Sequence, residues 1–218
     1  MIQIFDVVKM YDGTNPVLDS FSMEITKGEF VFLTGSSGAG KTTILKILFG
    51  QERFEKGQVL VHGINVGKLT HKNIYTLRRF MGVVFQDYKL LPNKTVFENV
   101  SFAQEVIGRD RKTIRLKTWE ALKNVGLTPK KDTYPACLSG GEQQRIAIAR
   151  AMVNEPSIIL ADEPTGNLDP DISIEILKLF EELNKKGTTI IFATHSQEII
   201  KRGEHRIINL SQGKAVES

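Results

Sequence analysis

A glycine-rich loop between an apolar strand and a helix constrains this chain more than any other feature. Residues 35–42 match the pattern G-x-x-x-x-G-K-[ST], directly after the apolar residues 30–33 and before a segment with helical periodicity. Glycines let backbone N–H groups surround phosphate oxygens with no Cβ in the way. The loop therefore predicts a site for nucleotide phosphates at the start of a helix. The residues of this predicted site are Gly35, Ser36, Ser37, Gly38, Ala39, Gly40, Lys41, Thr42 and Thr43.

The last residues of the loop and a distant acidic pair predict the chemistry. Lys41 can reach the β- and γ-phosphates as a point charge, and Thr42 can offer its hydroxyl to Mg²⁺. A loop of this kind needs an acid at the end of a neighbouring strand, and the apolar residues 157–161 precede Asp162 and Glu163. We expect Asp162 to hold Mg²⁺ through water and Glu163 to polarise an attacking water.

Strand-like and helix-like segments alternate along most of the chain, and residues 87–137 have a helical pattern. Alternation of this kind predicts an α/β fold in which helices cover both faces of a largely parallel sheet. We expect strands at residues 2–8, 21–25, 29–34, 59–62, 82–85, 157–161 and 188–193, and helices at 41–49, 141–153 and 172–186.

The composition excludes several classes of protein. The chain has 218 residues, a net charge of +4 and a single cysteine, Cys137, which excludes an intramolecular disulfide and a multi-cysteine zinc site. We expect Cys137 to contribute only packing. No apolar run approaches the about 20 residues of a membrane-spanning helix, and the N-terminus lacks the pattern of a secretory signal. These features predict a soluble cytoplasmic protein whose charge excess is too small to indicate nucleic acid.

Basic residues are dense in one part of the predicted helical region. A solvated helix face is the first interpretation, and contact with acidic lipid headgroups is the second. The residues concerned are Arg109, Arg111, Lys112, Arg115 and Lys117.

Residues 138–144 have the sequence Leu-Ser-Gly-Gly-Glu-Gln-Gln and predict a second helix start that binds anions. Ser139, Gly140 and Gly141 would supply a hydroxyl and backbone amides, although an ordinary helix cap has the same composition. One chain then carries two phosphate-binding helix starts but only one complete nucleotide site. Two copies related by two-fold symmetry could complete each other's sites.

With this segment lying between the two other motifs, the chain resembles the ATP-binding cassette (ABC) ATPase family over essentially its whole length. The resemblance implies ATP hydrolysis with Mg²⁺, a P-loop NTPase fold with an N-terminal antiparallel β region, and an inserted helical subdomain. It divides the single domain, residues 1–218, into a catalytic core of about 1–86 and 155–218 and a helical subdomain of about 87–154.

The same resemblance assigns roles to residues outside the main motifs. Tyr11 matches the aromatic residue that stacks on adenine, and Gln86 matches a glutamine near the metal and the membrane partner. Asp169 is expected at the seam of an ATP-bound dimer. His195 matches a histidine that orients water as a neutral donor, and Ser196 departs from the aspartate that commonly follows it.

Longer stretches, at residues 33–41, 84–92 and 95–100, resemble the bacterial cell-division members of the family. This resemblance implies that the chain acts with a second copy of itself and with an integral membrane partner. It also implies a location on the inner face of the cell membrane and a role in the control of peptidoglycan hydrolases. ATPases of lipoprotein-release and macrolide-type efflux transporters share much of the pattern and form the alternative. DNA-repair and ribosome-associated members fit poorly, because the chain has neither a long coiled coil nor a second cassette, so we expect no nucleic-acid partner.

The partner's cytoplasmic helix is expected to dock near residues 86–100. Tyr88, Leu90 and Leu91 are either apolar anchors of that contact or core residues of the helical subdomain.

Overall fold

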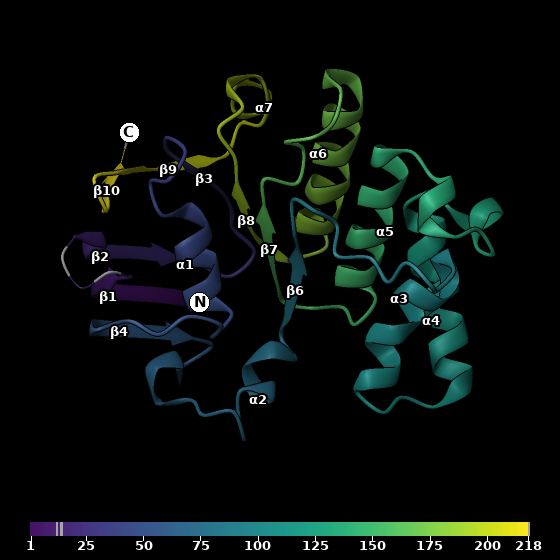
Figure 1. Ribbon diagram of the computed structural model, residues 1–218, viewed down its shortest axis with the longest axis horizontal. Helices are drawn as coiled ribbons and strands as arrows, with labels where there is room; N and C mark the ends of the chain where they lie inside the picture. Colours follow the sequence, from purple (N-terminus) through teal and green to yellow (C-terminus); the bar gives the residue numbers. More distant parts are fainter. Residues whose placement is uncertain (12, 14, 218) are drawn as a thin grey trace.

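A computed structural model describes residues 1–11, 13 and 15–217, and its helices and strands follow each other in the order shown by colour in Figure 1. The strands are β1 (Ile2–Met10), β2 (Pro16–Ile25), β3 (Phe30–Thr34), β4 (Lys56–Val61), β5 (Ile64–Asn65), β6 (Met81–Val84), β7 (Ile158–Asp162), β8 (Thr189–Ala193), β9 (Arg206–Ser211) and β10 (Lys214–Glu217). The α-helices are α1 (Lys41–Leu48), α2 (Tyr75–Arg78), α3 (Val96–Val106), α4 (Arg111–Asn124), α5 (Gly140–Met152), α6 (Pro170–Lys185) and α7 (Gln197–Arg202).

A six-stranded sheet in the order β10-β9-β3-β8-β7-β6 forms the centre of the molecule. Pairing is parallel from β9 through β3, β8 and β7 to β6, and only the edge strand β10 is antiparallel. The expected mostly parallel α/β sheet is confirmed.

The two faces of the central strands belong to two different hydrophobic cores. In β8, Ile190 and Phe192 enter one core, while Ile191 and Ala193 enter the other. This division follows from the period of two in a strand, and burial on both faces explains why these strands are continuous apolar runs. One core contains side chains from α3 to α7, and the other is built from α1 and the antiparallel strands. Figure 1 shows these two groups on opposite sides of the sheet.

The second sheet, in the order β2-β1-β4-β5, is entirely antiparallel, which confirms the expected N-terminal β region. Its apolar side chains, Ile2, Ile4 and Val7 among them, pack with Ile44 and Leu48 of α1.

Helices α3, α4 and α5 pack together beyond the edge strand β6 and form the expected helical insertion (Figure 1). Two of them begin with capping boxes, Thr95 with Glu98 at α3 and Ser139 with Glu142 at α5. The subdomain boundaries near residues 86 and 154 stay a prediction. None of the helices in the described part of the chain combines the length and the apolar character needed to cross a bilayer.

The predicted and observed elements differ mainly in the short segments. Helices α2 and α7 and strands β9 and β10 are absent from the sequence-based expectation. The two helices, of four and six residues, are too short to show a helical period, and the two strands lack the continuous apolar run of the central strands. The expected packing role of Cys137 is wrong, since the residue is exposed.

The residues proposed as partner contacts are half-buried, and two of them pack against the core. Tyr88 and Leu90 pack against the cluster formed by the helical side of the molecule, and the Leu91 N–H donates to Asn99 Oδ1 at 2.8 Å. The core interpretation of this segment therefore fits the structure better than the docking interpretation.

Substitution of Phe192 tests how much the core on the side of helices α3 to α7 contributes to stability. Its ring meets those of Phe180 and Phe32 edge-on, with centroids 5.1 and 5.6 Å apart. Phe192→Ala should lower the free energy of unfolding by about 3–5 kcal/mol, because it leaves a cavity between the sheet and α6. Chemical denaturation would measure this loss. Val106→Ala, at a side chain 69% exposed, should change it by less than about 0.5 kcal/mol, and equal losses in both variants would contradict the packing described.

Candidate nucleotide-binding and catalytic site

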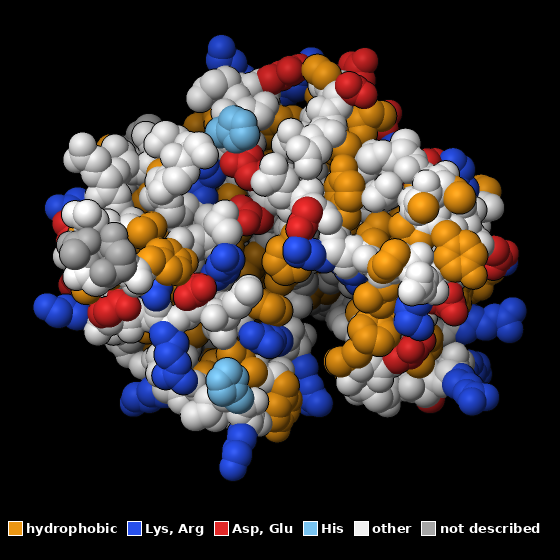
Figure 2. All heavy atoms as spheres, viewed as in Figure 1, with side chains coloured by type: hydrophobic (Ala, Val, Ile, Leu, Met, Phe, Trp, Pro, Cys, Tyr) orange, Lys and Arg blue, Asp and Glu red, His pale blue; other side chains and the backbone are white. Residues whose placement is uncertain are grey.

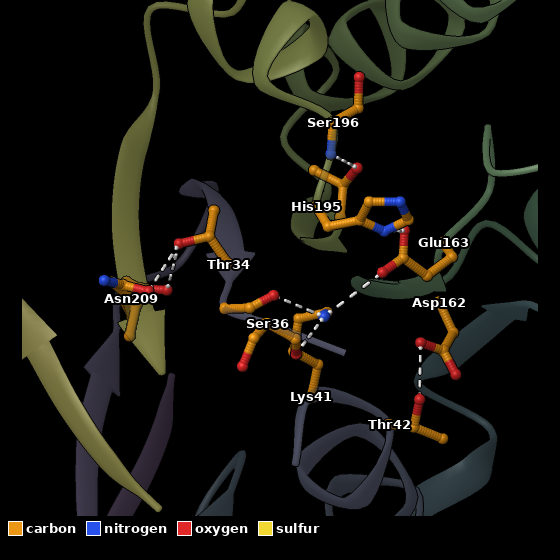
Figure 3. A network of polar contacts seen from close by, with 12 residues as sticks. Thr34, Ser36, Lys41, Thr42, Asp162, Glu163, His195, Ser196 and Asn209 are labelled. Atoms are coloured by element: carbon orange, nitrogen blue, oxygen red, sulfur yellow. Dashed lines mark hydrogen bonds and ion pairs between the residues drawn. The ribbon is translucent and has the colours of Figure 1, made fainter. Parts of the chain in front are cut away.

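The candidate site lies where β3, β7 and β8 end. These strands are parallel neighbours, so the loops that follow Thr34, Asp162 and Ala193 meet at one edge of the sheet. Figure 3 shows the polar side chains of these loops pointing toward one another. The topology alone thus brings together three segments that are more than a hundred residues apart at the extremes.

The loop between β3 and α1 follows a path that requires glycine. Gly35 has a φ of 143°, and a Cβ there would lie 2.5 Å from the Leu210 carbonyl oxygen. Gly40 caps α1 in the left-handed conformation with a φ of 107°. The backbone of this loop therefore adopts a conformation that only glycine tolerates at these two positions.

Lys41 begins α1, and its ammonium group is turned into the loop. The side chain is almost buried, and Nζ donates to the carbonyl oxygens of Gly35 at 2.9 Å and Ser36 at 3.2 Å. Nζ also lies 3.4 Å from Glu163 Oε1 (Figure 3). A buried ammonium group with these partners provides a localised positive charge next to the loop amides.

Thr42 and Asp162 meet beside the loop. The Thr42 hydroxyl donates to Asp162 Oδ1 at 3.1 Å (Figure 3). Burial raises the pKa of Asp162, the hydrogen bond from Thr42 opposes that rise, and the neighbouring charge of Glu163 adds to it. Without a bound metal ion, this carboxylate therefore carries its negative charge at a cost to the stability of the folded state.

Glu163 is held between two basic side chains. Besides its contact with Lys41, its Oε2 lies 2.9 Å from Nδ1 of His195. Its backbone has a φ of 46°, and its N–H donates to the Ala193 carbonyl, which directs the carboxylate into the gap between the strand ends. His195 is two-thirds exposed on its side chain, so its ring can still reach a ligand at this edge.

Ser196 does not support the imidazole of His195. Its hydroxyl accepts from the Ile199 N–H at the start of α7, and its own N–H donates to Thr194 Oγ1 at 3.1 Å. Glu163 is the residue that orients His195 in this structure.

Two further predicted site residues also lie at this edge. The hydroxyl of the exposed Tyr11 lies 3.3 Å from Thr43 Oγ1, which places the ring beside the first turn of α1. Gln86 is exposed after β6, and a Cβ on Gly166 would lie 3.3 Å from its Nε2. Gln86 therefore lies against the turn that follows Glu163.

The predicted second anion-binding helix start is not part of this cluster. Among the described residues, no hydrogen bond or ion pair joins Ser139, Gly140 or Gly141 to the loop after β3. The Ser139 hydroxyl accepts from the Glu142 N–H as the cap of α5. Asp169, exposed at the start of α6, makes no side-chain cap. Within one chain, the two predicted phosphate-binding ends remain separate (Figure 1).

The structure adds three polar residues that the sequence patterns do not reveal. Lys9 Nζ lies 4.8 Å from the centroid of the Tyr11 ring and is held by Glu52 and Glu55, each 3.7 Å away. Thr34 Oγ1 donates to Asn209 Oδ1 at 3.4 Å beside the loop. No sequence signal could have identified Asn209, because it belongs to β9, which the patterns miss.

The raised pKa of Asp162 predicts a pH effect on stability in the absence of nucleotide and metal. The folded state holds this proton more tightly than the unfolded state, so stability should fall as pH rises from the ordinary Asp range through the raised pKa. Asp162→Asn removes that loss. The variant's unfolding free energy minus that of the wild type should therefore increase with pH, as thermal denaturation at several pH values would show. A difference that does not change with pH would contradict the assignment.

Comparison with known proteins agrees with this geometry. Residues 18–166 match the protein family described as ABC transporter. The chain is 50% identical over 216 residues to the cell division ATP-binding protein FtsE of Streptococcus pneumoniae, with 99% of this chain and 94% of the relative covered. It is 47% identical to FtsE of Bacillus subtilis (98% and 93% covered) and 44% identical to FtsE of Escherichia coli (98% and 96% covered).

Solved structures give the same result for the fold. The dimeric post-hydrolysis state of the ATP-binding cassette MJ0796 bound to ADP and Pi has a TM-score of 0.89 and 35% identity, covering 99% of this chain and 96% of that one. For cbiO1 of Clostridium perfringens, part of the transporter complex cbiONQ, the TM-score is 0.90 and the identity 32%, over 99% and 86% of the chains. The chain therefore belongs to the ABC transporter family as an ABC ATPase, and it resembles the FtsE proteins of that family over nearly its full length.

Proposed function

We propose that two copies of this chain hydrolyse ATP between them, as the cytoplasmic subunit of a membrane complex that acts in cell division. The contact of Glu163 with both Lys41 and His195, next to the paired Thr42 and Asp162, is the observation that carries the enzymatic part. These groups combine a phosphate-binding cation, a candidate base and a polar imidazole at one helix N-terminus.

The neighbouring contacts support a distinct role for each group. Lys41 would exchange the Gly35 and Ser36 carbonyls for phosphate oxygens when ATP binds, since a charged oxygen is the stronger acceptor. Glu163, no longer paired with Lys41, would then accept a proton from the attacking water. His195 would orient that water and the γ-phosphate. The exposed ring of Tyr11, beside α1, would stack on the adenine of ATP.

The donor set also fits Mg²⁺. This ion prefers a few hard oxygen ligands and keeps several waters. Thr42 and Asp162 supply a hydroxyl and a carboxylate 3.1 Å apart, and Gln86 lies at the adjacent turn. In the described part of the chain, no group of three or more His, Cys, Asp or Glu residues is arranged to hold a metal ion, so phosphates and water would complete the coordination. When bound, the ion would neutralise charge on the phosphates.

A second copy would complete the site. Ser139, Gly140 and Gly141 make no bond to the loop of their own chain in the described residues, so the partner copy's equivalents would reach the γ-phosphate instead, with Asp169 at the seam. The MJ0796 structures are described as dimeric, which supports this arrangement.

A groove between α2 and α3 is the best candidate for docking a membrane partner. Its volume is about 580 Å³, and Figure 2 shows a deep hollow between the two lobes of the molecule. An amphipathic helix laid in such a groove uses apolar anchors with polar contacts at the rim. The lining includes Tyr75, Arg78, Phe102, Val106, Ile107 and Arg150.

The cellular role follows from the relatives. All the curated proteins compared above are named as cell division ATP-binding proteins. We therefore assign the groove to a cytoplasmic helix of an FtsX-like integral membrane protein, which would place the chain on the inner face of the membrane. Cycles of ATP-driven dimerisation would be passed through that partner to peptidoglycan hydrolases. Recovery of a lipoprotein-release or efflux subunit as the native partner would contradict this role and leave the ATPase chemistry intact.

Glu163→Gln tests the catalytic assignment. The amide keeps the size of the side chain but cannot accept the proton, so ATP binding should persist while hydrolysis falls by about 100-fold or more. Phosphate release and size-exclusion chromatography with ATP would show slow turnover and an accumulated dimer. Glu198→Gln makes the same change on the exposed surface of α7 and should retain full activity. Turnover like that of the wild type in Glu163→Gln would refute the assignment.

Val106→Asp tests the groove. A carboxylate at its mouth should reduce co-purification of the membrane partner by at least about tenfold, because an apolar contact would lose its match. ATP binding by the isolated chain should be unchanged. Leu116→Asp places the same charge on an exposed apolar residue outside the groove and serves as the control. Equal recovery of the partner by both variants would contradict the docking site.

A further inference from the structure

Two segments far apart in the sequence, each contributing residues to the lining of the groove, are rich in basic side chains. The first, residues 64–80, contains α2 and has no Asp or Glu. The second, residues 107–115, leads into α4 and has one acid, Asp110. All the Lys and Arg side chains of the two segments are exposed. We call this set the basic rim, and it consists of Lys68, Lys72, Arg78, Arg79, Arg109, Arg111, Lys112 and Arg115.

The basic rim forms no ion pairs within the described part of the chain, although Arg109, Arg111 and Arg115 line a second hollow that also contains Glu98, Glu105 and Asp132. None of its ammonium or guanidinium groups lies within 4.0 Å of a described carboxylate, whereas the nearby Lys117 pairs with Glu155 and Glu120. Arg78 and Arg79 lie instead over the rings of Phe49 and Tyr75. The carboxylate of Asp110 accepts three bonds as the cap of α4, from the N–H groups of Lys112 and Thr113 and from the Thr113 hydroxyl.

The groove connects the two halves of the basic rim. Arg78 and Arg79 line it at the end of α2, and Val106 and Ile107 line it at the end of α3, just before Arg109 in the sequence. Figure 2 shows Lys and Arg side chains along the lower edge of the molecule, on both sides of the hollow. Tyr75 and Val106 are exposed by 54% and 69% at its mouth. The surface around the proposed docking site thus combines unpaired positive charge with exposed apolar side chains.

We propose that the basic rim binds the anionic phospholipid headgroups that surround the membrane partner. This inference rests on the proposed function in one respect, because it requires the groove to face the bilayer. Each basic side chain near an anionic surface strengthens binding by about fivefold, and apolar side chains add contact with the interface. A nucleic acid fits the rim less well, because an apolar groove divides the charges where a phosphate backbone needs a continuous track.

Sedimentation with lipid vesicles tests the proposal on the full-length chain alone. Vesicles containing phosphatidylglycerol and phosphatidylcholine should bind the protein, and vesicles of pure phosphatidylcholine should not. Binding should weaken strongly between about 0.05 and 0.5 M salt, because exposed charges are screened. Lys68→Ala/Lys72→Ala/Arg111→Ala/Arg115→Ala removes two charges from each basic segment and should lower vesicle affinity at least about tenfold.

Controls separate this result from the proposed function. Lys178→Ala/Lys201→Ala removes exposed charges from α6 and α7 and should leave vesicle binding almost unchanged. The fourfold variant should still hydrolyse ATP within about twofold of the wild-type rate and co-purify with the membrane partner in detergent, because the groove lining and the site are intact. Vesicle binding equal to that of the wild type in the fourfold variant would overturn the proposal. So would failure of the wild type to bind anionic vesicles, or tighter binding to a DNA duplex at the same salt.

Discussion

Strands β3, β7 and β8 are covered on both faces, so a shift of one residue in any of them would exchange side chains between two separate cores. The burial of residues such as Phe192 and Leu33 therefore determines the register of the sheet. The same register sets how far each strand extends at its carboxyl end. It therefore fixes the positions of Asp162, Glu163 and His195 at that edge of the sheet. The geometry of the candidate site thus depends on hydrophobic packing that contains none of the proposed catalytic residues.

The charged groups at this edge of the sheet are only partly neutralised by one another. Lys41 is bound by carbonyl oxygens and by one carboxylate oxygen of Glu163, and the other oxygen of Glu163 meets His195. Asp162 has a raised pKa despite the Thr42 hydrogen bond, because burial disfavours its charge. A ligand that brings phosphate to Lys41 and a metal ion to Asp162 would satisfy both groups better than their present partners do. Mg·ATP has this combination of charges.

The face that carries the groove has a different character from the site. It combines an apolar channel with positive side chains that have no acidic neighbours within ion-pair distance in the described structure. A helix of a membrane protein and the lipid around it would match these two properties separately. Binding at that face would be coupled to the site through a short connection, since β6 lines the groove and Gln86 lies two residues beyond its end. This proximity gives a physical route from partner to nucleotide.

Local patterns in the sequence determined most of the chemistry. The glycine-rich loop, the apolar run before Asp162 and Glu163, and the Ser-Gly-Gly helix start all rely on contiguous residues, so their structures follow from local conformational rules. Even Ser139 behaves as a local cap in the structure. The central strands could also be predicted from the sequence, because burial on both faces makes them continuously apolar.

Tertiary structure alone decided the contacts between distant segments. The placement of Glu163 between Lys41 and His195 depends on three strands lying side by side. The contacts of Lys9 with Glu52 and Glu55 also join distant segments. The assignment of Tyr88 and Leu90 to the core, and the meeting of α2 with α3 at one groove, likewise arise from packing. Spacing along a chain encodes neighbours within a few residues, whereas the folded arrangement of two hydrophobic cores sets the distances between segments a hundred residues apart.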